Sequence, residues 1–268
     1  MQKRLEAARR LAREAGQLIL KMAQEGINAS TKSDNSIVTQ ADIAADRYIS
    51  EALSREFPED GRLTEESFVY QPSPNGLTWV VDPIDGTKAY AKQIPGYSVM
   101  IGLLQDKEPV LGVVYDPLED WMYYAIRGEG AFGVAVAGGE PLPLRVASEL
   151  AVEEMKLLTS PSAPETRRKA VQELLGVREG PIVNSVGVKV GLLVRAEGDV
   201  YFNGHKLHYW DTVAPLVIAQ EAGAQATLLD GSPFTYDLSA PGWEHPQGCL
   251  MTCSSRSHDD FLTKLRTL

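Results

Sequence analysis

Residues 79–88 read Trp79-Val80-Val81-Asp82-Pro83-Ile84-Asp85-Gly86-Thr87-Lys88. The apolar run before Asp82 is typical of a buried strand, and Pro83 is expected to stop its sheet pairing. A second carboxylate, Asp85, follows three residues later. Gly86 and Thr87 are then expected to open a short helix whose free backbone N–H groups can bind an anion. Two neighbouring acids beside such a turn favour a site for a metal ion and a phosphate.

The same stretch also has an ordinary explanation. Asp-Pro and Asp-Gly are common in turns, and a lone Asp-Pro-x-Asp-Gly motif is more often a loop than a site. The rest of the chain has to decide between the two.

Composition limits the class of protein. The chain has 268 residues, of which 44% are hydrophobic and 23% charged, which fits one large domain or two closely packed halves and excludes a disordered chain. Its net charge of -10 argues against a nucleic-acid polymer or an anionic membrane as partner, because both require a basic surface. The charge suits a protein that concentrates cations.

No targeting or spanning segment is expected. Residues 1–6 are charged from the start, and no apolar run is long enough to cross a bilayer. The two cysteines, Cys249 and Cys253, exclude a disulfide framework and are expected to lie in the core near a late strand. We therefore expect a cytoplasmic protein.

The first half, residues 1–139, is predicted to be α+β. Apolar residues at helical spacing predict a helix from Leu5 to a stop near Gly26, and a polar loop or irregular hairpin is expected over 30–36. A second helix begins at Thr39 with a capping box to Asp42, whose ordinary role would be to stabilise the helix start. Alternating apolar runs over 97–104, 109–115, 122–126 and 131–136 predict an antiparallel meander.

Two adjacent glutamates, Glu65 and Glu66, follow a short predicted strand that begins at Arg62. Neighbouring residues on a strand point to opposite faces, so only one of the two is expected to face a given site.

The second half, residues 140–268, is predicted to alternate strands and helices. The expected strands are 156–159, 199–202, 224–229 and 249–252, and the expected helices are 165–175, 188–195, 211–221 and one from His258. Asp211 stands in the first turn of its helix, where capping alone would explain it.

Three motifs, in this order, resemble the inositol monophosphatase superfamily of magnesium-dependent, lithium-sensitive phosphatases. They are Glu65-Glu66-Ser67, residues 79–87 and Trp210-Asp211-Thr212-Val213-Ala214-Pro215, and the resemblance extends over nearly the whole chain. Residues 32–42, Lys88 after Asp-Gly-Thr, and the last motif are more like the 3'(2'),5'-bisphosphate nucleotidases. The resemblance implies an α/β fold, the layered α-β-α-β-α sandwich of the sugar phosphatases.

The resemblance also implies the ligands of two Mg²⁺ ions. It assigns the first ion to Glu66, Asp82 and the carbonyl of Ile84, and the second to Asp82, Asp85 and Asp211. It allows Glu66 to reach a third, looser ion. Hard oxygen ligands suit magnesium. Four carboxylates in one cleft would repel one another in a purely structural protein, which favours the metal interpretation.

Catalytic roles follow from the same resemblance. Asp42 is paired with Thr87, whose hydroxyl positions the attacking water, and the N–H groups of Gly86 and Thr87 receive phosphate oxygens. The implied reaction is in-line displacement at phosphorus with a metal-activated water. Lys189 matches by position a lysine near the second phosphate or the base, although an ordinary surface lysine at a helix start explains it equally well.

The implied substrate is adenosine 3',5'-bisphosphate, cleaved at the 3' phosphate. An inositol monophosphatase or fructose 1,6-bisphosphatase of broad specificity is the alternative, and Asn203-Gly204 departs from the arginine that many nucleotidases carry there. A non-catalytic phosphate sensor on the same fold is a third hypothesis, disfavoured because every ligand position is filled. The resemblance allows a homodimer, with a small phosphate ester as the only other partner.

Overall fold

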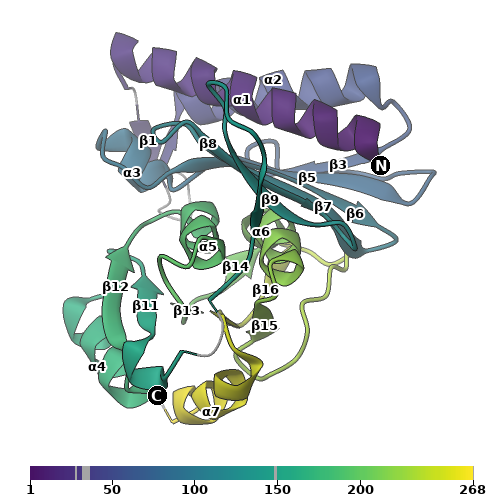
Figure 1. The fold of residues 1–268 in the computed structure, drawn as a ribbon. Coiled ribbons are helices and arrows are strands. Elements are labelled where there is room, and N and C mark those ends of the chain that lie inside the picture. Colours follow the sequence, from purple (N-terminus) through teal and green to yellow (C-terminus); the bar gives the residue numbers. More distant parts are fainter. Residues whose placement is uncertain (28, 32–36, 148–149, 268) are drawn as a thin grey trace.

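The computed structural model describes residues 1–27, 29–31, 37–147 and 150–267 of the chain. Helices and sheets alternate in five layers (Figure 1). Helices α1 (Gln2–Glu25) and α2 (Gln40–Glu56) cover an eight-stranded sheet. Helices α5 (Val186–Val194) and α6 (Tyr209–Glu221) separate it from a five-stranded sheet, which α4 (Glu165–Leu175) and α7 (Ser255–Leu265) cover from below. The predicted α-β-α-β-α sandwich is confirmed.

The two N-terminal helices form where their sequence patterns predict them. The apolar face of α1 is buried from Leu5 to Ile19, and the helix stops before Gly26. Helix α2 begins with the expected capping box, in which Thr39 Oγ1 lies 3.4 Å from the Asp42 N–H and Asp42 Oδ2 accepts the Thr39 N–H at 2.7 Å. The apolar spacing of the first helix and the capping box of the second were therefore sufficient to predict where these helices form.

The eight-stranded sheet has the order β10-β9-β8-β7-β6-β5-β3-β4, and the predicted meander forms its antiparallel part from β6 to β9. Strand β10 lies beyond residue 139 and pairs with β9, so this sheet extends into the second half of the chain. The strands are β3 (Gly61–Thr64), β4 (Tyr70–Gln71), β5 (Leu77–Asp85), β6 (Ser98–Gln105), β7 (Glu108–Asp116), β8 (Trp121–Ile126), β9 (Gly130–Ala135) and β10 (Leu142–Leu144).

Strand β5 corrects one expectation. Pairing with β6 does not stop at Pro83, because Asp82 is opposite Met100 and Asp85 is opposite Ser98 with a register irregularity between them. Proline lacks an N–H donor, so the ladder skips there and resumes afterwards. The strand therefore carries both acids.

The five-stranded sheet has the order β12-β11-β13-β17-β15. Strand β11 is parallel to both β12 and β13, and β17 is antiparallel to β13 and β15. Strand β12 was not predicted, because Arg-Glu-Gly-Pro-Ile has no alternating apolar pattern. The strands are β11 (Lys156–Thr159), β12 (Arg178–Ile182), β13 (Val200–Asn203), β15 (Gln225–Leu228) and β17 (Cys249–Thr252).

The remaining elements are short. Strands β1 (Ala29–Thr31) and β2 (Ile37–Thr39) pair antiparallel around the expected loop or hairpin, of which residues 32–36 lie outside the described residues. Strands β14 (Leu207–His208) and β16 (Glu244–His245) form a second small ladder, and η1 (Val152–Glu154) is a single turn.

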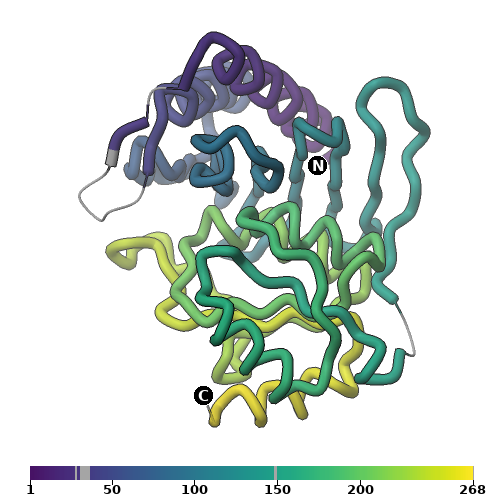
Figure 2. Tube along the Cα trace, turned by 90° about the vertical axis from the view of Figure 1, so that its left-hand side faces the viewer, coloured from purple at the N-terminus to yellow at the C-terminus, as the bar shows by residue number. Residues whose placement is uncertain are grey.

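The two halves of the chain stack on each other, the first above the second in Figure 2. Cys249 and Cys253 are buried and free, as expected. None of the helices in the described ranges is both long and apolar enough to cross a membrane.

Candidate active site

Three carboxylates meet where β5 ends against α6. Ligand oxygens of Asp82, Asp85 and Asp211 all lie within 4.8 Å of one another. Two residues three apart on a regular strand would point to opposite faces, so the irregularity at Pro83 is what lets Asp82 and Asp85 converge. Asp211 comes from the first turn of α6, more than a hundred residues away. We call these three residues the acidic cluster.

The acidic cluster is electrostatically costly without a cation. Asp82 is 2% exposed, and its Oδ1 is buried with no hydrogen-bond partner in the described part of the chain. Burial raises the pKa of Asp82 well above its ordinary value, and the carboxylates of Glu65, Asp85 and Asp211 raise it further. Burial, followed by Asp85, raises the pKa of Asp211 to about 7. An orphaned buried oxygen among hard carboxylate donors fits a divalent cation such as Mg²⁺.

Each outer member of the acidic cluster is held through one oxygen. Asp85 Oδ2 accepts the Gly187 N–H at 2.8 Å and the Ser185 hydroxyl, with the Ser98 hydroxyl at 3.3 Å. Asp211 Oδ2 accepts the His208 N–H at 2.7 Å, as the far half of a capping box that starts α6. Among the described residues, no hydrogen bond is made to the second oxygen of either side chain, which leaves that oxygen free to bind a cation.

Glu65 and Glu66 lie in a turn and not on a strand, because β3 ends at Thr64. The turn is set by the Glu65 N–H, which bonds the Val81 carbonyl at 3.1 Å, and by the Phe68 N–H, which bonds the Thr64 carbonyl at 3.1 Å. Strand alternation, used above to choose between the two glutamates, therefore does not apply. Glu65 hydrogen-bonds Asp82, whereas the charge of Glu66 acts on Asp42. The metal assignment of Glu66 stays a prediction, and the structure adds Glu65 beside it.

Asp42 and Thr87 are in contact. Thr87 Oγ1 lies 3.1 Å from Asp42 Oδ1 and 3.0 Å from the carbonyl of Ile84, so its single proton can go to either oxygen. Asp42 is fully buried, and burial raises its pKa to about 6. The predicted pair is therefore brought together, while its catalytic role remains a prediction.

The predicted anion-binding turn has the expected local form. Gly86 has φ 92°, a left-handed conformation that side chains rarely adopt, and α3 (Thr87–Ala91) starts directly after it. Lys88 is in the first turn of this helix. A cleft of about 200 Å³ opens here, lined by Ile37, Glu65, Gly86, Thr87, Lys88, Ser160, Ser162 and Asn184.

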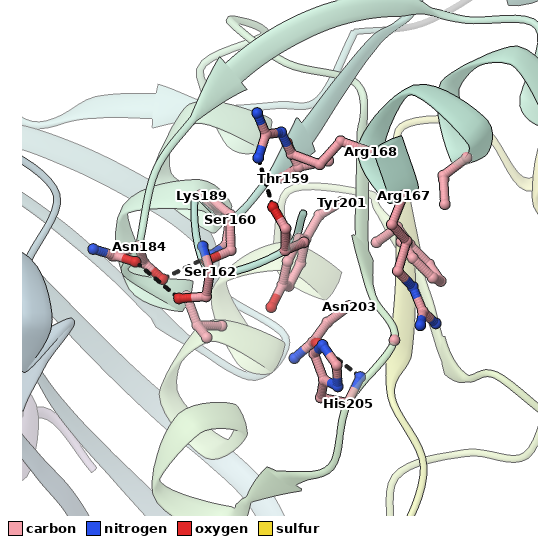
Figure 3. Close-up of a pocket in the computed structure, with 15 residues that line it drawn as sticks. Thr159, Ser160, Ser162, Arg167, Arg168, Asn184, Lys189, Tyr201, Asn203 and His205 are labelled. Carbon is pink, nitrogen blue, oxygen red and sulfur yellow. Dashed lines mark hydrogen bonds between the residues drawn. The ribbon is translucent and has the colours of Figure 1, made fainter. Parts of the chain in front are cut away.

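A second cavity of about 200 Å³ adjoins this cleft and shares Ser160, Ser162 and Asn184 with it (Figure 3). We call it the side pocket. Its polar lining is neutral or basic, and its apolar lining includes two aromatic rings of β13. The lining consists of Thr159, Ser160, Ser162, Ala163, Arg167, Arg168, Val171, Asn184, Val186, Lys189, Tyr201, Phe202, Asn203, Gly204 and His205.

Lys189 lines the side pocket but is not a surface lysine. It is 2% exposed, its Nζ donates to the carbonyls of Val183 at 2.9 Å and Asn184 at 2.8 Å, and it lies 5.3 Å from the centre of the Tyr201 ring. Burial lowers its pKa to about 8, against the raising effect of Asp85. Two of the three N–H donors of the Lys189 ammonium are therefore used in hydrogen bonds to backbone carbonyls.

Sequence reasoning missed the residues that approach the site from other segments. Ser185 is recognisable as a helix N-cap before an apolar run, but nothing local indicates its bond to Asp85. Arg167 and His205 belong to a helix and a loop with no motif of their own. No single-sequence signal would have found their convergence.

Comparison with known proteins gives one consistent result. A family model described as "Inositol monophosphatase family" matches residues 1–259. The histidinol-phosphatase of Mycobacterium tuberculosis is 32% identical over 241 residues, covering 89% of this chain and 88% of that protein. The 3'(2'),5'-bisphosphate nucleotidase CysQ of Aggregatibacter actinomycetemcomitans is 28% identical over 231 residues, covering 85% of each. An IMPase structure from Thermotoga maritima superimposes with a TM-score of 0.83 at 24% identity, covering 99% of this chain and 97% of that one.

Proposed function

The chain belongs to the inositol monophosphatase family, and on that premise we propose that it removes the 3' phosphate from adenosine 3',5'-bisphosphate. The two relatives described above are phosphatases of this family, and the chain is a metal-dependent phosphomonoester hydrolase. The relatives differ in substrate, and the choice among substrates is our inference. The observation that carries it is the character of the side pocket next to the acidic cluster.

The side pocket suits an anionic leaving group with an aromatic ring. Four of its lining residues are basic, namely Arg167, Arg168, Lys189 and His205, and none is acidic. Tyr201 and Phe202 provide ring faces on which a base can pack. A nucleoside bisphosphate whose 3' phosphate is at the acidic cluster would extend its base and second phosphate into this pocket.

Arg167 and His205 are the better candidates for contact with the remote phosphate. Both are exposed at the pocket, whereas Arg168 donates to the Ala163 carbonyl at 2.6 Å and Lys189 donates to two carbonyls. Arg167 lies over the end of β13, where a Cβ added at Gly204 would be 3.0 Å from its Nη2. A charge-assisted hydrogen bond from such a group contributes about 1.5–3 kcal/mol.

The alternative substrates find fewer complementary groups here. An inositol ring has neither an aromatic face to pack on the rings of β13 nor a second phosphate for the basic residues, and histidinol phosphate carries an ammonium that needs a carboxylate. The pocket lining has two aromatic rings and basic side chains but no carboxylate. This difference favours a nucleotide over both.

Magnesium is the proposed metal, at two sites with a third, looser one. Asp82, Asp85 and Asp211 would hold it together with the Ile84 carbonyl and a glutamate, for which the proximity to Asp82 favours Glu65 over Glu66. When bound, Mg²⁺ supplies an activated water and stabilises the leaving oxygen. Lithium is expected to inhibit at about millimolar concentration, in an uncompetitive or mixed pattern.

The protein's own groups orient the reactants. Thr87 Oγ1 donates its proton to Asp42 Oδ1, which turns the lone pairs of the hydroxyl toward the cleft, where they accept a proton from the attacking water. At neutral pH Asp42 is mostly ionised because its pKa is about 6, so it serves as the acceptor. The N–H groups at Gly86 and Thr87 bind the phosphate oxygens.

A substrate panel tests the proposal. We would measure kcat/KM for adenosine 3',5'-bisphosphate, inositol 1-phosphate, histidinol phosphate and fructose 1,6-bisphosphate with the wild type, Arg167→Met and Lys169→Met. Lys169 is the matched control, because it lies on the same helix, pairs with Glu165 at 2.6 Å and is outside the side pocket.

The bisphosphate should be preferred by the wild type, with AMP as product. Arg167→Met should lower kcat/KM for it by about 10- to 100-fold and leave inositol 1-phosphate nearly unchanged. Lys169→Met should behave as wild type. A wild-type preference for inositol 1-phosphate or histidinol phosphate would reject the nucleotidase assignment.

A further inference from the structure

Hydrogen bonds to four backbone groups hold residues 183–185, the segment that joins the side pocket to the acidic cluster. The Val183 N–H bonds the Thr159 carbonyl at 2.9 Å, and the Ser185 N–H bonds the Gly96 carbonyl at 3.1 Å. The carbonyls of Val183 and Asn184 both accept from Lys189 Nζ. The peptide group between Asn184 and Ser185 is therefore fixed at its oxygen by Lys189 and at its nitrogen by Gly96.

Ser185 links this fixed backbone to the carboxylate of Asp85. Its hydroxyl oxygen accepts the Val188 N–H at 2.9 Å as the N-cap of α5, and its proton goes to Asp85 Oδ2. The Ser98 hydroxyl lies 2.9 Å from Ser185 Oγ and can donate its single proton either there or to Asp85 Oδ2 at 3.3 Å. Ser185 is fully buried, so its hydroxyl has no alternative partner in water.

Gly187 completes the clamp on Asp85. Its N–H reaches Asp85 Oδ2 at 2.8 Å because no side chain intervenes. An added Cβ would lie 2.5 Å from Ser98 Oγ and 2.8 Å from Val114 Cγ1. The start of α5 can therefore approach β5 and β6 closely only with glycine at this position.

We propose that Ser185 and Lys189 are positioning residues for the metal ligand Asp85. Lys189 holds the backbone before α5, Ser185 and Gly187 hold Asp85 Oδ2, and Asp85 Oδ1 is thereby aimed at the cation. On this inference Lys189 acts through Ser185 and not through the substrate's remote phosphate. The inference rests on the proposed metal-dependent function, but it does not depend on which phosphate ester is the substrate.

Residues 184–186 connect the side pocket to the acidic cluster. Asn184 and Val186 line the side pocket, and Ser185 between them bonds the acidic cluster. Partners that orient a metal ligand from behind typically affect metal affinity by about 10- to 100-fold when removed. The predicted signature is thus a loss of metal affinity without any change in substrate choice.

Metal binding can be measured without turnover. We would titrate Mg²⁺ and Mn²⁺ into the wild type, Ser185→Ala, Lys189→Met and the double variant by calorimetry with no substrate present. We would also record the rise in melting temperature that each metal causes. Ser98→Ala is the comparison variant, because it removes the longer of the two hydroxyl contacts at Asp85 Oδ2, at 3.3 Å, while the other contact of Ser98 is to Ser185 Oγ at 2.9 Å.

Ser185→Ala should raise the Kd for the metal by about 10- to 100-fold, and Lys189→Met by about tenfold. Ser98→Ala should have a smaller effect. If Lys189 acts through Ser185, the double variant should bind metal about as weakly as Ser185→Ala alone. The ratio of kcat/KM for adenosine 3',5'-bisphosphate to that for inositol 1-phosphate should stay unchanged in Lys189→Met.

Two results would overturn the inference. One is an unchanged metal Kd in Ser185→Ala. The other is a Lys189→Met variant that keeps its metal affinity but changes the substrate ratio tenfold, which would make Lys189 a direct substrate contact. Should Lys189→Met fail to fold, the Ser185→Ala titration alone decides. A wild type that prefers another phosphate ester would reject the nucleotidase assignment and leave this inference standing.

Discussion

The acidic cluster and the side pocket adjoin each other, but the chain builds them in different ways. Two of the three acids of the cluster lie on one strand, three residues apart, and the third caps a helix. The side pocket takes its lining from β11, α4, α5 and β13 and from the loops beside them. The cluster carries negative charge that only a cation can balance, whereas the pocket is basic and apolar. This difference suggests that the cluster determines the chemistry and the pocket determines the substrate.

The largest effect should come from the cluster. Asp85→Asn removes one charge while keeping the shape and the bonds at Oδ2, so kcat/KM should fall by about 10³-fold for every substrate alike. The far-UV circular dichroism spectrum should be unchanged. Asp116→Asn is the control, a buried carboxylate at the turn between β7 and β8, and it should remain active. A substrate-dependent loss in Asp85→Asn would contradict the separation of chemistry from selectivity.

The Asp42 and Thr87 pair should behave as one unit. Thr87→Ala and Asp42→Asn should each lower kcat by about 10²-fold, because the first removes the hydroxyl and the second removes the carboxylate that orients it, and both should change magnesium affinity little. Thr87→Ser keeps the hydroxyl and serves as the control. The double variant should be about as slow as either single one. Losses that multiply would show that the two side chains act independently.

The second half should respond to acid through two buried imidazoles. His258 bonds Thr227 and Thr252 at 2.9 Å each, and burial lowers the pKa values of His258 and His245 to about 4. Between pH 6.5 and 4 these two imidazoles become protonated in the unfolded chain but stay neutral in the folded chain. Stability should therefore fall as pH falls through this window, by on the order of 2 kcal/mol per imidazole.

Urea unfolding with saturating Mg²⁺, at steps from pH 7 to pH 4, measures this dependence. His258→Gln should be less stable at pH 7, because it loses ring contacts, but should have a shallower pH dependence. An equally steep dependence in His258→Gln would rule out His258 as a source.

The smallest effect concerns the metal-free protein. Asp82→Asn removes a buried charge with an unpartnered oxygen from among like charges. In EDTA it should stabilise the fold by about 1 kcal/mol, which corresponds to a melting temperature about 2–4 °C higher. The rise in melting temperature on adding Mg²⁺ should be lost. A lower melting temperature in EDTA than the wild type would show that the cluster is not a stability cost.

Several features of the site followed from local sequence. The capping box of Thr39 and Asp42 and the order of the predicted elements rest on patterns within a few residues, so they could be read from the chain. The convergence of Asp82 and Asp85 was suggested by their spacing, although the reason, a skipped ladder position at Pro83, was not. The turn at Glu65 and Glu66 was not predicted, because residues that follow the end of a strand can adopt many conformations.

What the sequence determined by itself is therefore the family, through its motifs, and with it the layered fold and the reaction class, whereas the assignment of the acids as metal ligands stays a prediction. The tertiary structure decided which glutamate bonds Asp82, which residues line the side pocket and how Lys189 is used. Ser185 and Asp85 are 100 residues apart, and their bond depends on where α5 packs against β5 and β6. Local propensity acts over one or two turns of chain, whereas such contacts are selected by packing of the whole core.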